Sequence, residues 1–207
     1  KPYFSHCIAV ANTLASWKMD VTTIIAGLLH DTIEDTDATI EEIIDIFGND
    51  LGHLVDGLTK ISGINYSSRK EKQAGNFMKM LLSVAQDLRV VIIKFADRIH
   101  NMETIKHMPR IKRHRIAVET RDIYVPLAHR LGMSSVKSQL EDLVFSVLNP
   151  SGFKEMESNL RSSKKQREKF IKKVIKPVRE ELEKYDIFPK VYGRAKSYAS
   201  IYGKMMT

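Results

Sequence analysis

Apolar residues recur every three or four positions along most of this chain, which is the spacing of one buried face of an α-helix. The segment from Val21 to Leu29 shows it clearly, with Asp20 standing at its start as an N-cap. Gly27 inside this segment permits close contact with another helix. The chain is therefore predicted to be all-α over most of its length.

Two further segments carry strong local signals. Thr39 and Glu42 have the spacing of a capping box, and Gly48 is placed to end the helix that follows them. Val90 to Ile93 could be mistaken for a buried strand, but helical spacing continues to Met102 and favours a central helix. We also expect helices at 51–58, 70–86, 115–131 and 136–148, a loop at 61–68, and a break at Asn149, Pro150 and Gly152.

The last quarter of the chain differs from the rest in its composition and its pattern of apolar residues. Residues 161–176 are rich in lysine and arginine with interspersed apolar positions, which predicts an amphipathic helix with a solvated basic face. After Pro189 a short strand-like stretch precedes an amphipathic tail. We interpret residues 1–150 as one helical domain with its central helices, and residues 151–207 as a basic helical segment followed by the opening of a different domain.

Bulk composition limits the partners. The 207 residues have a formal charge of +8, which favours a polyanionic partner such as a nucleotide with several phosphates, RNA or an acidic protein surface. No apolar run is long enough to cross a bilayer. The single cysteine, Cys7, cannot form an internal disulfide and is best read as a small buried residue. A cytoplasmic location is expected.

The segment LLHDTIEDT carries the densest chemical signal. His30, Asp31, Glu34 and Asp35 place one imidazole and three carboxylates within six positions. This donor set suits a divalent cation such as Mn²⁺, which can activate water and screen phosphate charge. A His-Asp pair alone, however, is more often a surface or capping pair.

Two distant residues are candidates to complete the same site. His6 and Asp97 each lie near an end of a predicted helix that faces the core. A carboxylate on an otherwise apolar helix needs a cation or a hydrogen-bond donor nearby, because burying it unpaired is costly. His100 and His129 are interpreted as structural residues, and the remaining histidines as ordinary surface or core residues: His53, His107 and His114.

Five blocks, in this order, resemble the RelA/SpoT family of bifunctional guanosine tetra- and pentaphosphate synthetase/hydrolases, which act in the stringent response. They are KPYFSHCIAVA (Lys1 to Ala11), AGLLHDTIEDT (Ala26 to Thr36), KFADRIHNM (Lys94 to Met102), ETRDIYVPLAHRLG (Glu119 to Gly132) and VYGRAKSYASIYGKM (Val191 to Met205). The first three resemble its HD-type hydrolase domain, the fourth resembles its helical centre, and the last resembles the start of its α/β synthetase domain.

The resemblance implies a role for each candidate residue. The ligands of one Mn²⁺ would be His6, His30, Asp31 and Asp97. Glu34 and Asp35 would position and deprotonate the water that attacks the 3′-pyrophosphate, releasing pyrophosphate and leaving GDP or GTP. Family members without this acidic pair resemble synthetases that have lost the hydrolase activity. The nucleotide would contact Asn101 and Thr104, with Met108 against the base.

The synthetase part of the resemblance is incomplete. An ATP-side basic cluster is implied at Arg194, Lys196, Ser200 and Lys204. The family's acidic synthetase residues would lie beyond Thr207, and its N-terminal basic segment before Lys1, so a fragment without synthetase activity is expected. In the full-length protein, contacts with the ribosome or regulatory proteins are implied. Two alternatives stay open: another HD-type nucleotide phosphohydrolase, and a non-catalytic nucleotide-sensing module.

Overall fold

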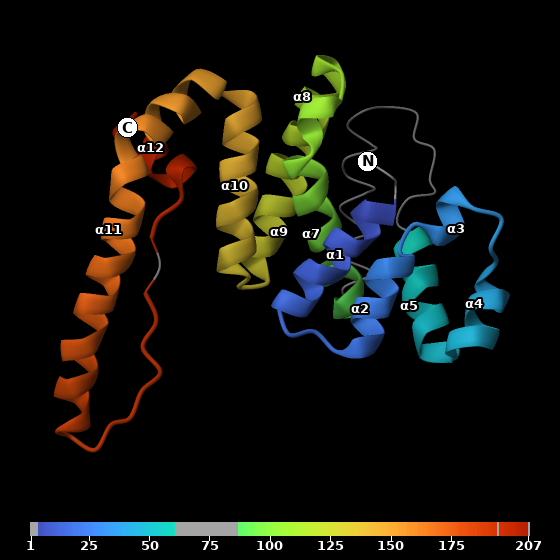
Figure 1. Cartoon of the computed structure of the whole chain (residues 1–207), viewed down its shortest axis with the longest axis horizontal. Coiled ribbons are helices and arrows are strands. Elements are labelled where there is room, and N and C mark those ends of the chain that lie inside the picture. The colour runs from blue at the N-terminus through green and yellow to red at the C-terminus, as the bar shows by residue number, and fades with distance from the viewer. Residues whose placement is uncertain (1–3, 61–86, 194, 207) are drawn as a thin grey trace.

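A computed structural model describes residues 4–60, 87–193 and 195–206, and every regular element within these ranges is a helix (Figure 1). The elements are, in chain order, α1 (Phe4–Ser16), α2 (Val21–Leu29), α3 (Thr32–Asp35), α4 (Ile40–Phe47), α5 (Asn49–Lys60), α7 (Leu88–Glu103), the 3₁₀ turn η1 (Ile105–His107), α8 (Arg110–Glu119), the π turn η2 (Thr120–Tyr124), α9 (Val125–Arg130), α10 (Ser134–Leu148), α11 (Pro150–Glu183) and α12 (Tyr198–Met205). The expected all-α fold is confirmed. The loop predicted at 61–68 and the helix predicted at 70–86 lie outside the described residues.

Helix α7 is buried on two opposite sides. Val90 and Ile93 belong to a hydrophobic core shared with α1, α2, α4 and α5. Val91 and Phe95 belong to a second core shared with η2, α9 and α10. A helix that contacts apolar neighbours on both sides needs an almost continuous apolar sequence, which explains why the run from Val90 resembles a strand.

The helix caps predicted at Asp20, Thr39 and Gly48 are present in the structure, whereas the helices predicted at 51–58 and 136–148 each begin two residues earlier. Asp20 accepts hydrogen bonds from the Thr23 backbone nitrogen at 3.0 Å and from the Thr23 hydroxyl at 2.5 Å. The capping box of Thr39 and Glu42 is formed in both directions, at 2.9 and 3.2 Å. Gly27 lies where a Cβ atom would come within 2.4 Å of a Leu14 methyl carbon, so α1 and α2 pack closely as expected.

One predicted helix is interrupted. We expected a single helix over 115–131, but the structure begins α8 at Arg110, directly after Pro109, and inserts the π turn before α9. Pro126 near the start of α9 has no N–H, so the regular α-helical hydrogen bond to Asp122 cannot form there. The π turn also brings Tyr124 to α7, where its hydroxyl accepts a hydrogen bond from Arg98 at 2.8 Å.

The break predicted at 149–152 is a single residue long. Helix α10 ends at Leu148, and Asn149 caps the next helix by accepting a hydrogen bond from the Gly152 nitrogen at 3.0 Å. Pro150 occupies the first turn of α11, where its missing N–H costs nothing. The break is therefore a sharp corner between two helices.

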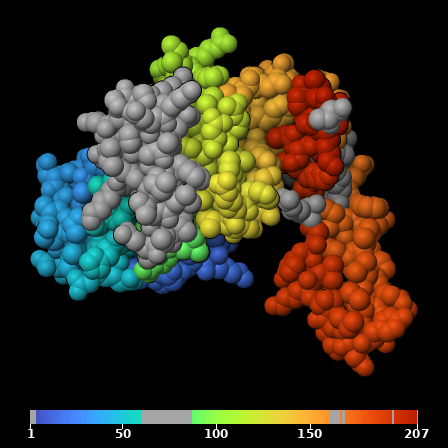
Figure 2. Space-filling model, turned by 180° about the vertical axis from the view of Figure 1, so that it is seen from behind, coloured from blue at the N-terminus to red at the C-terminus, as the bar shows by residue number. Residues whose placement is uncertain are grey.

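The basic segment is helical, as predicted, and forms part of α11. Its described lysines are exposed, namely Lys169, Lys172, Lys173 and Lys176. The chain then returns along α11, and Gly193 contacts Ile171 (Figure 1). Figure 2 shows this part projecting from the body of the molecule.

The strand-like stretch predicted after Pro189 was wrong. The described residues between 187 and 197 form no strand, because a strand needs a partner to pair its backbone and this part of the structure offers none. Helix α12 follows and packs against α10 and α11. No helix in the described ranges is both long and apolar enough to span a membrane.

The core around α7 should dominate stability. Leu54 on α5 is only 2% exposed within the first core, so Leu54→Ala is expected to lower the free energy of unfolding by about 2–5 kcal/mol. Ile46 on α4 is 72% exposed, and Ile46→Ala should change the free energy of unfolding by less than about 0.5 kcal/mol. Urea unfolding followed by circular dichroism measures both; equal losses would contradict this assignment of the core.

Candidate metal centre

Three helices bring His6, His30 and Asp97 together. His6 lies in the first turn of α1, His30 directly follows α2, and Asp97 is on α7. The Nε2 atoms of the two histidines are 3.2 Å apart. The Oδ1 atom of Asp97 lies 3.2 Å from His6 Nε2 and 3.8 Å from His30 Nε2. One potential ligand atom from each of the three residues falls within 4.8 Å of the others.

Asp31 adds a second carboxylate at the same point. Its Oδ2 atom is 3.0 Å from His30 Nε2 and 3.9 Å from His6 Nε2. Asp31 occupies the N-cap position of α3 without a capping hydrogen bond from its side chain, and the turn that carries Glu34 and Asp35 starts at this residue. Two imidazole nitrogens and two carboxylates therefore converge, which is the set of four that the sequence singled out.

The three shorter of these distances, 3.0–3.2 Å, fit a shared cation. Two donors that bind one ion at about 2.1 Å from neighbouring coordination positions lie about 3.0–3.4 Å apart. His30 Nδ1 lies 2.9 Å from the Gly27 carbonyl oxygen, so Nδ1 carries the proton and the Nε2 lone pair faces the other residues. Lone pairs and carboxylates that face one another repel unless a proton or a cation lies between them. The donor set suits a divalent metal.

The pKa shifts of Asp97 and His30 agree with a site that binds a cation. Burial raises the pKa of Asp97, but its contact with His6 and the charge of Lys94 outweigh burial, so its pKa is lowered. Burial lowers the pKa of His30, but its hydrogen bond to Asp31 and the charges of both aspartates outweigh it, so its pKa is raised. The site therefore attracts positive charge, whether a proton or a metal ion.

The acidic pair lies on the solvent side of the site. Glu34 and Asp35 are both exposed on the four-residue helix α3. The thiol of Cys7 has a raised pKa, caused by burial first and then by the charges of Asp31 and Asp35. Cys7 follows His6 in α1. The effect of Asp35 on the Cys7 thiol therefore shows that this carboxylate lies near the end of α1 that carries His6. Cys7 itself is buried, as expected.

The residues proposed for the nucleotide follow Asp97 along α7. Asn101 donates a hydrogen bond to Asp97 Oδ1 at 2.6 Å, and the Thr104 hydroxyl donates to the His100 carbonyl at 2.8 Å. Met108 instead packs on a third apolar cluster with Met102. Asn101 is thus hydrogen-bonded to a residue of the candidate metal centre, whereas part of the Met108 side chain packs against the hydrophobic core.

The synthetase-side residues form a separate group. The side chain of Lys204 lies within hydrogen-bonding reach of Lys196, and this contact, together with the charge of Lys204, lowers the pKa of Lys196. Ser200 donates its backbone N–H to Ser197 Oγ at 3.2 Å in the first turn of α12. Arg194 lies outside the described residues.

Two residues near the metal centre escaped the sequence reasoning. His100, interpreted as structural, has its Nδ1 atom 2.6 Å from His6 Nδ1. Lys94 is only 7% exposed, one turn before Asp97. A lysine within the apolar run VVIIKFAD was the available signal for Lys94. His100 had no such signal, because its contact depends on how α1 packs against α7.

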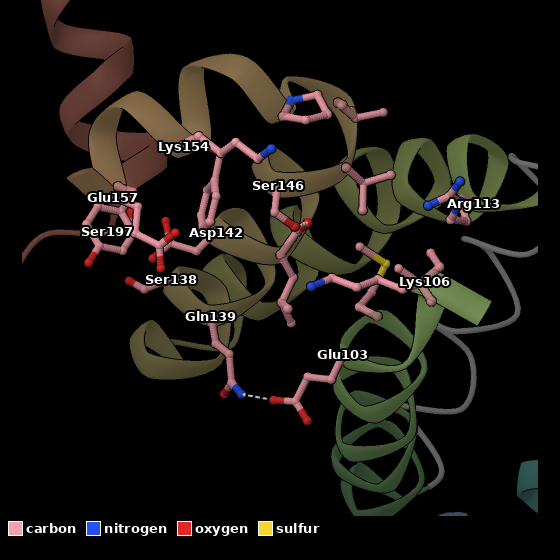
Figure 3. Close-up of a pocket in the computed structure, with 18 of the residues that line it drawn as sticks. Glu103, Lys106, Arg113, Ser138, Gln139, Asp142, Ser146, Lys154, Glu157 and Ser197 are labelled. Carbon is pink, nitrogen blue, oxygen red and sulfur yellow. Dashed lines mark hydrogen bonds between the residues drawn. The ribbon is translucent and has the colours of Figure 1, made fainter. Parts of the chain in front are cut away.

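A cavity of about 1120 Å³ lies elsewhere, between α7, η1, α8, α10 and α11. Figure 3 shows the side chains of Lys106 and Lys154 pointing into it, with Gln139 hydrogen-bonded to Glu103 at one edge. None of the four clustered His and Asp residues lines it. The cavity is therefore separate from the candidate metal centre.

Comparison with known proteins identifies the domain. A family model described as HD domain matches residues 1–134, which include every residue of the candidate metal centre. The chain belongs to the HD domain family. It is 48% identical over 208 residues to a GTP pyrophosphokinase of Myxococcus xanthus, covering 99% of this chain and 28% of that protein. It is 42% identical over 206 residues to the bifunctional (p)ppGpp synthase/hydrolase SpoT of Escherichia coli, covering 100% of this chain and 29% of that protein.

A solved structure extends the likeness of this HD domain. It is a metazoan ortholog of SpoT, described as hydrolysing ppGpp and acting in starvation responses. The TM-score is 0.54 at 25% identity, covering 70% of this chain and 80% of that one. The chain spans less than a third of the length of the two bacterial relatives named above, so their names describe larger proteins.

The raised pKa of His30 predicts a pH dependence in metal-free protein. Its contribution to stability is fully present below about pH 6.5 and is lost as the pH rises through the raised value. His30→Gln should therefore flatten the fall in unfolding temperature as the pH rises above about 6.5. Thermal unfolding in EDTA measures this, with His53→Gln on exposed His53 as control. A slope equal to that of the parent protein would contradict the prediction.

Proposed function

We propose that this chain is a Mn²⁺-dependent hydrolase that removes pyrophosphate from the 3′ position of guanosine tetra- or pentaphosphate. The observation that carries the proposal is the convergence of His6, His30 and Asp97 beside Asp31, with an acidic pair on the next turn. The names of the bacterial relatives and the described activity of the metazoan structure support the substrate.

The metal ligands are proposed to be His6, His30, Asp31 and Asp97. When bound, the metal would lower the pKa of a coordinated water and screen the phosphate charge. Mixed imidazole and carboxylate donors favour a cation of borderline to hard character, which supports Mn²⁺. The hydrogen bond from Asn101 holds Asp97 Oδ1 in place at 2.6 Å.

Glu34 and Asp35 are proposed as the catalytic pair. Both are exposed and follow Asp31 by three and four residues, which keeps them near the candidate metal centre and open to solvent. One carboxylate accepts a proton from the attacking water, and the other orients that water by hydrogen bonding. The nucleotide is proposed to extend along α7 past Asn101 and Thr104 toward Met108.

The remaining assignments concern the longer protein. We propose that residues 1–150 form the hydrolase unit and that residues 151–207 begin the synthetase unit. In that second unit, an ATP-side cluster would comprise Arg194, Lys196, Ser200 and Lys204. A cytoplasmic site of action and contacts of the full-length protein with the ribosome or regulatory proteins are part of the same proposal.

Substrate choice distinguishes this activity from the alternatives. With Mn²⁺, the purified chain is expected to convert guanosine tetraphosphate to GDP and pyrophosphate while leaving GTP intact, as measured by anion-exchange chromatography. Release of phosphate from GTP with the tetraphosphate untouched would favour another HD-type phosphohydrolase. Tight nucleotide binding without turnover would favour a sensing module.

Variants separate metal binding from catalysis. Asp97→Ala and His30→Ala should lose both Mn²⁺ binding and turnover. Glu34→Gln should retain Mn²⁺ affinity and lower kcat by about 10²–10⁴-fold, the usual contribution of a general base. Glu41→Gln, which changes an exposed glutamate in the first turn of α4, is the matched control and should leave both unchanged. Equal activity in all four variants would refute the site; metal affinity is measured by titration calorimetry.

A further inference from the structure

His6 uses both of its ring nitrogens. Its Nε2 atom faces the candidate metal centre, 3.2 Å from His30 Nε2 and 3.2 Å from Asp97 Oδ1. Its Nδ1 atom faces away from that centre and lies 2.6 Å from Nδ1 of His100. The rings of His6 and His100 are tilted by 49° with centroids 4.7 Å apart, so they meet at their nitrogens and do not stack.

The tautomer of His6 follows from this geometry. A neutral imidazole has one nitrogen that carries hydrogen and one with a free lone pair, and only the lone pair binds a metal. If Nε2 binds the metal, Nδ1 carries the hydrogen and donates it to the nearest acceptor. That acceptor is Nδ1 of His100, which then carries its own hydrogen on Nε2.

We propose that His100 is a positioning residue that fixes the metal-binding tautomer and ring orientation of His6. His30 has an equivalent partner in the Gly27 carbonyl oxygen, 2.9 Å from its Nδ1 atom. Both histidines of the centre would therefore be held through the nitrogen opposite the metal, an arrangement common to histidine ligands in proteins. This inference rests on the metal centre of the proposed function.

His100 also joins two helices at the site. It lies three residues after Asp97 on α7, and therefore one turn along nearly the same face. Asp97 contacts Nε2 of His6 and His100 contacts Nδ1, so α7 holds both sides of a ring that belongs to α1. His6 is only the third residue of α1, and the ends of helices fray more readily than their middles. A second contact from α7 restrains a ligand at such a position.

A matched pair of substitutions tests the acceptor role. His100→Asn keeps an oxygen close to the place of Nδ1, whereas His100→Leu has a similar shape without an acceptor. We expect His100→Leu to weaken Mn²⁺ binding by about 10–100-fold, the usual effect of removing such a partner. His100→Asn should stay within about threefold of the parent protein, and His107→Ala, at an exposed histidine on η1, should have no effect.

Electron paramagnetic resonance of free Mn²⁺ measures the affinity, and thermal unfolding in EDTA checks that the metal-free variants are equally stable. Turnover of His100→Leu should recover when Mn²⁺ is raised to saturation. If Leu and Asn variants bind Mn²⁺ equally, whether tightly or weakly, His100 does not act as an acceptor and the proposal is wrong. Mn²⁺ binding by the parent without tetraphosphate hydrolysis would refute the proposed function, while the affinity comparison would still decide the role of His100.

Discussion

Burial of α7 between two hydrophobic cores is the constraint on which the site depends. Val90, Val91 and the residues from Ile93 to Ala96 are buried, so Lys94 lies where charges are normally excluded, and Asp97 follows it within one turn. A carboxylate held there must have partners, and those partners come from α1, from the end of α2 and from α7 itself. The packing of apolar residues thus fixes the positions of the polar ones, because α7 cannot move without opening both cores.

Local features of the fold could be predicted from the sequence because they depend on neighbouring residues. The caps at Asp20 and at Thr39 are formed by side chains within three positions, and the structure contains both. The interruption at the π turn was missed, since the effect of Pro126 on a helix depends on how the next turn packs. The strand after Pro189 was predicted from composition alone, and a strand cannot form without a partner.

In the candidate site too, the signals between neighbouring residues could be predicted from the sequence, whereas contacts between distant residues were harder to predict. The cluster from His30 to Asp35 is visible in nine consecutive residues, whereas His6 and Asp97 required an inference about helix ends. The structure brings His6 and Asp97 to His30, although their role as ligands stays a prediction. The contact between His6 and His100 could not be predicted, since it spans 94 positions and depends on the rotation of two helices about their own axes.

Helix α3 has an evolutionary consequence. It is four residues long, buries none of them, and presents Glu34 and Asp35 to solvent. Substitutions at exposed positions of this kind usually change stability by less than about 0.5 kcal/mol. Selection for folding therefore places almost no constraint on the acidic pair, in contrast to α7, where the apolar residues from Val90 to Met102 belong to the hydrophobic cores. Under the proposed function, a lineage that no longer needs hydrolysis can lose these two carboxylates through single mutations and still keep an intact fold.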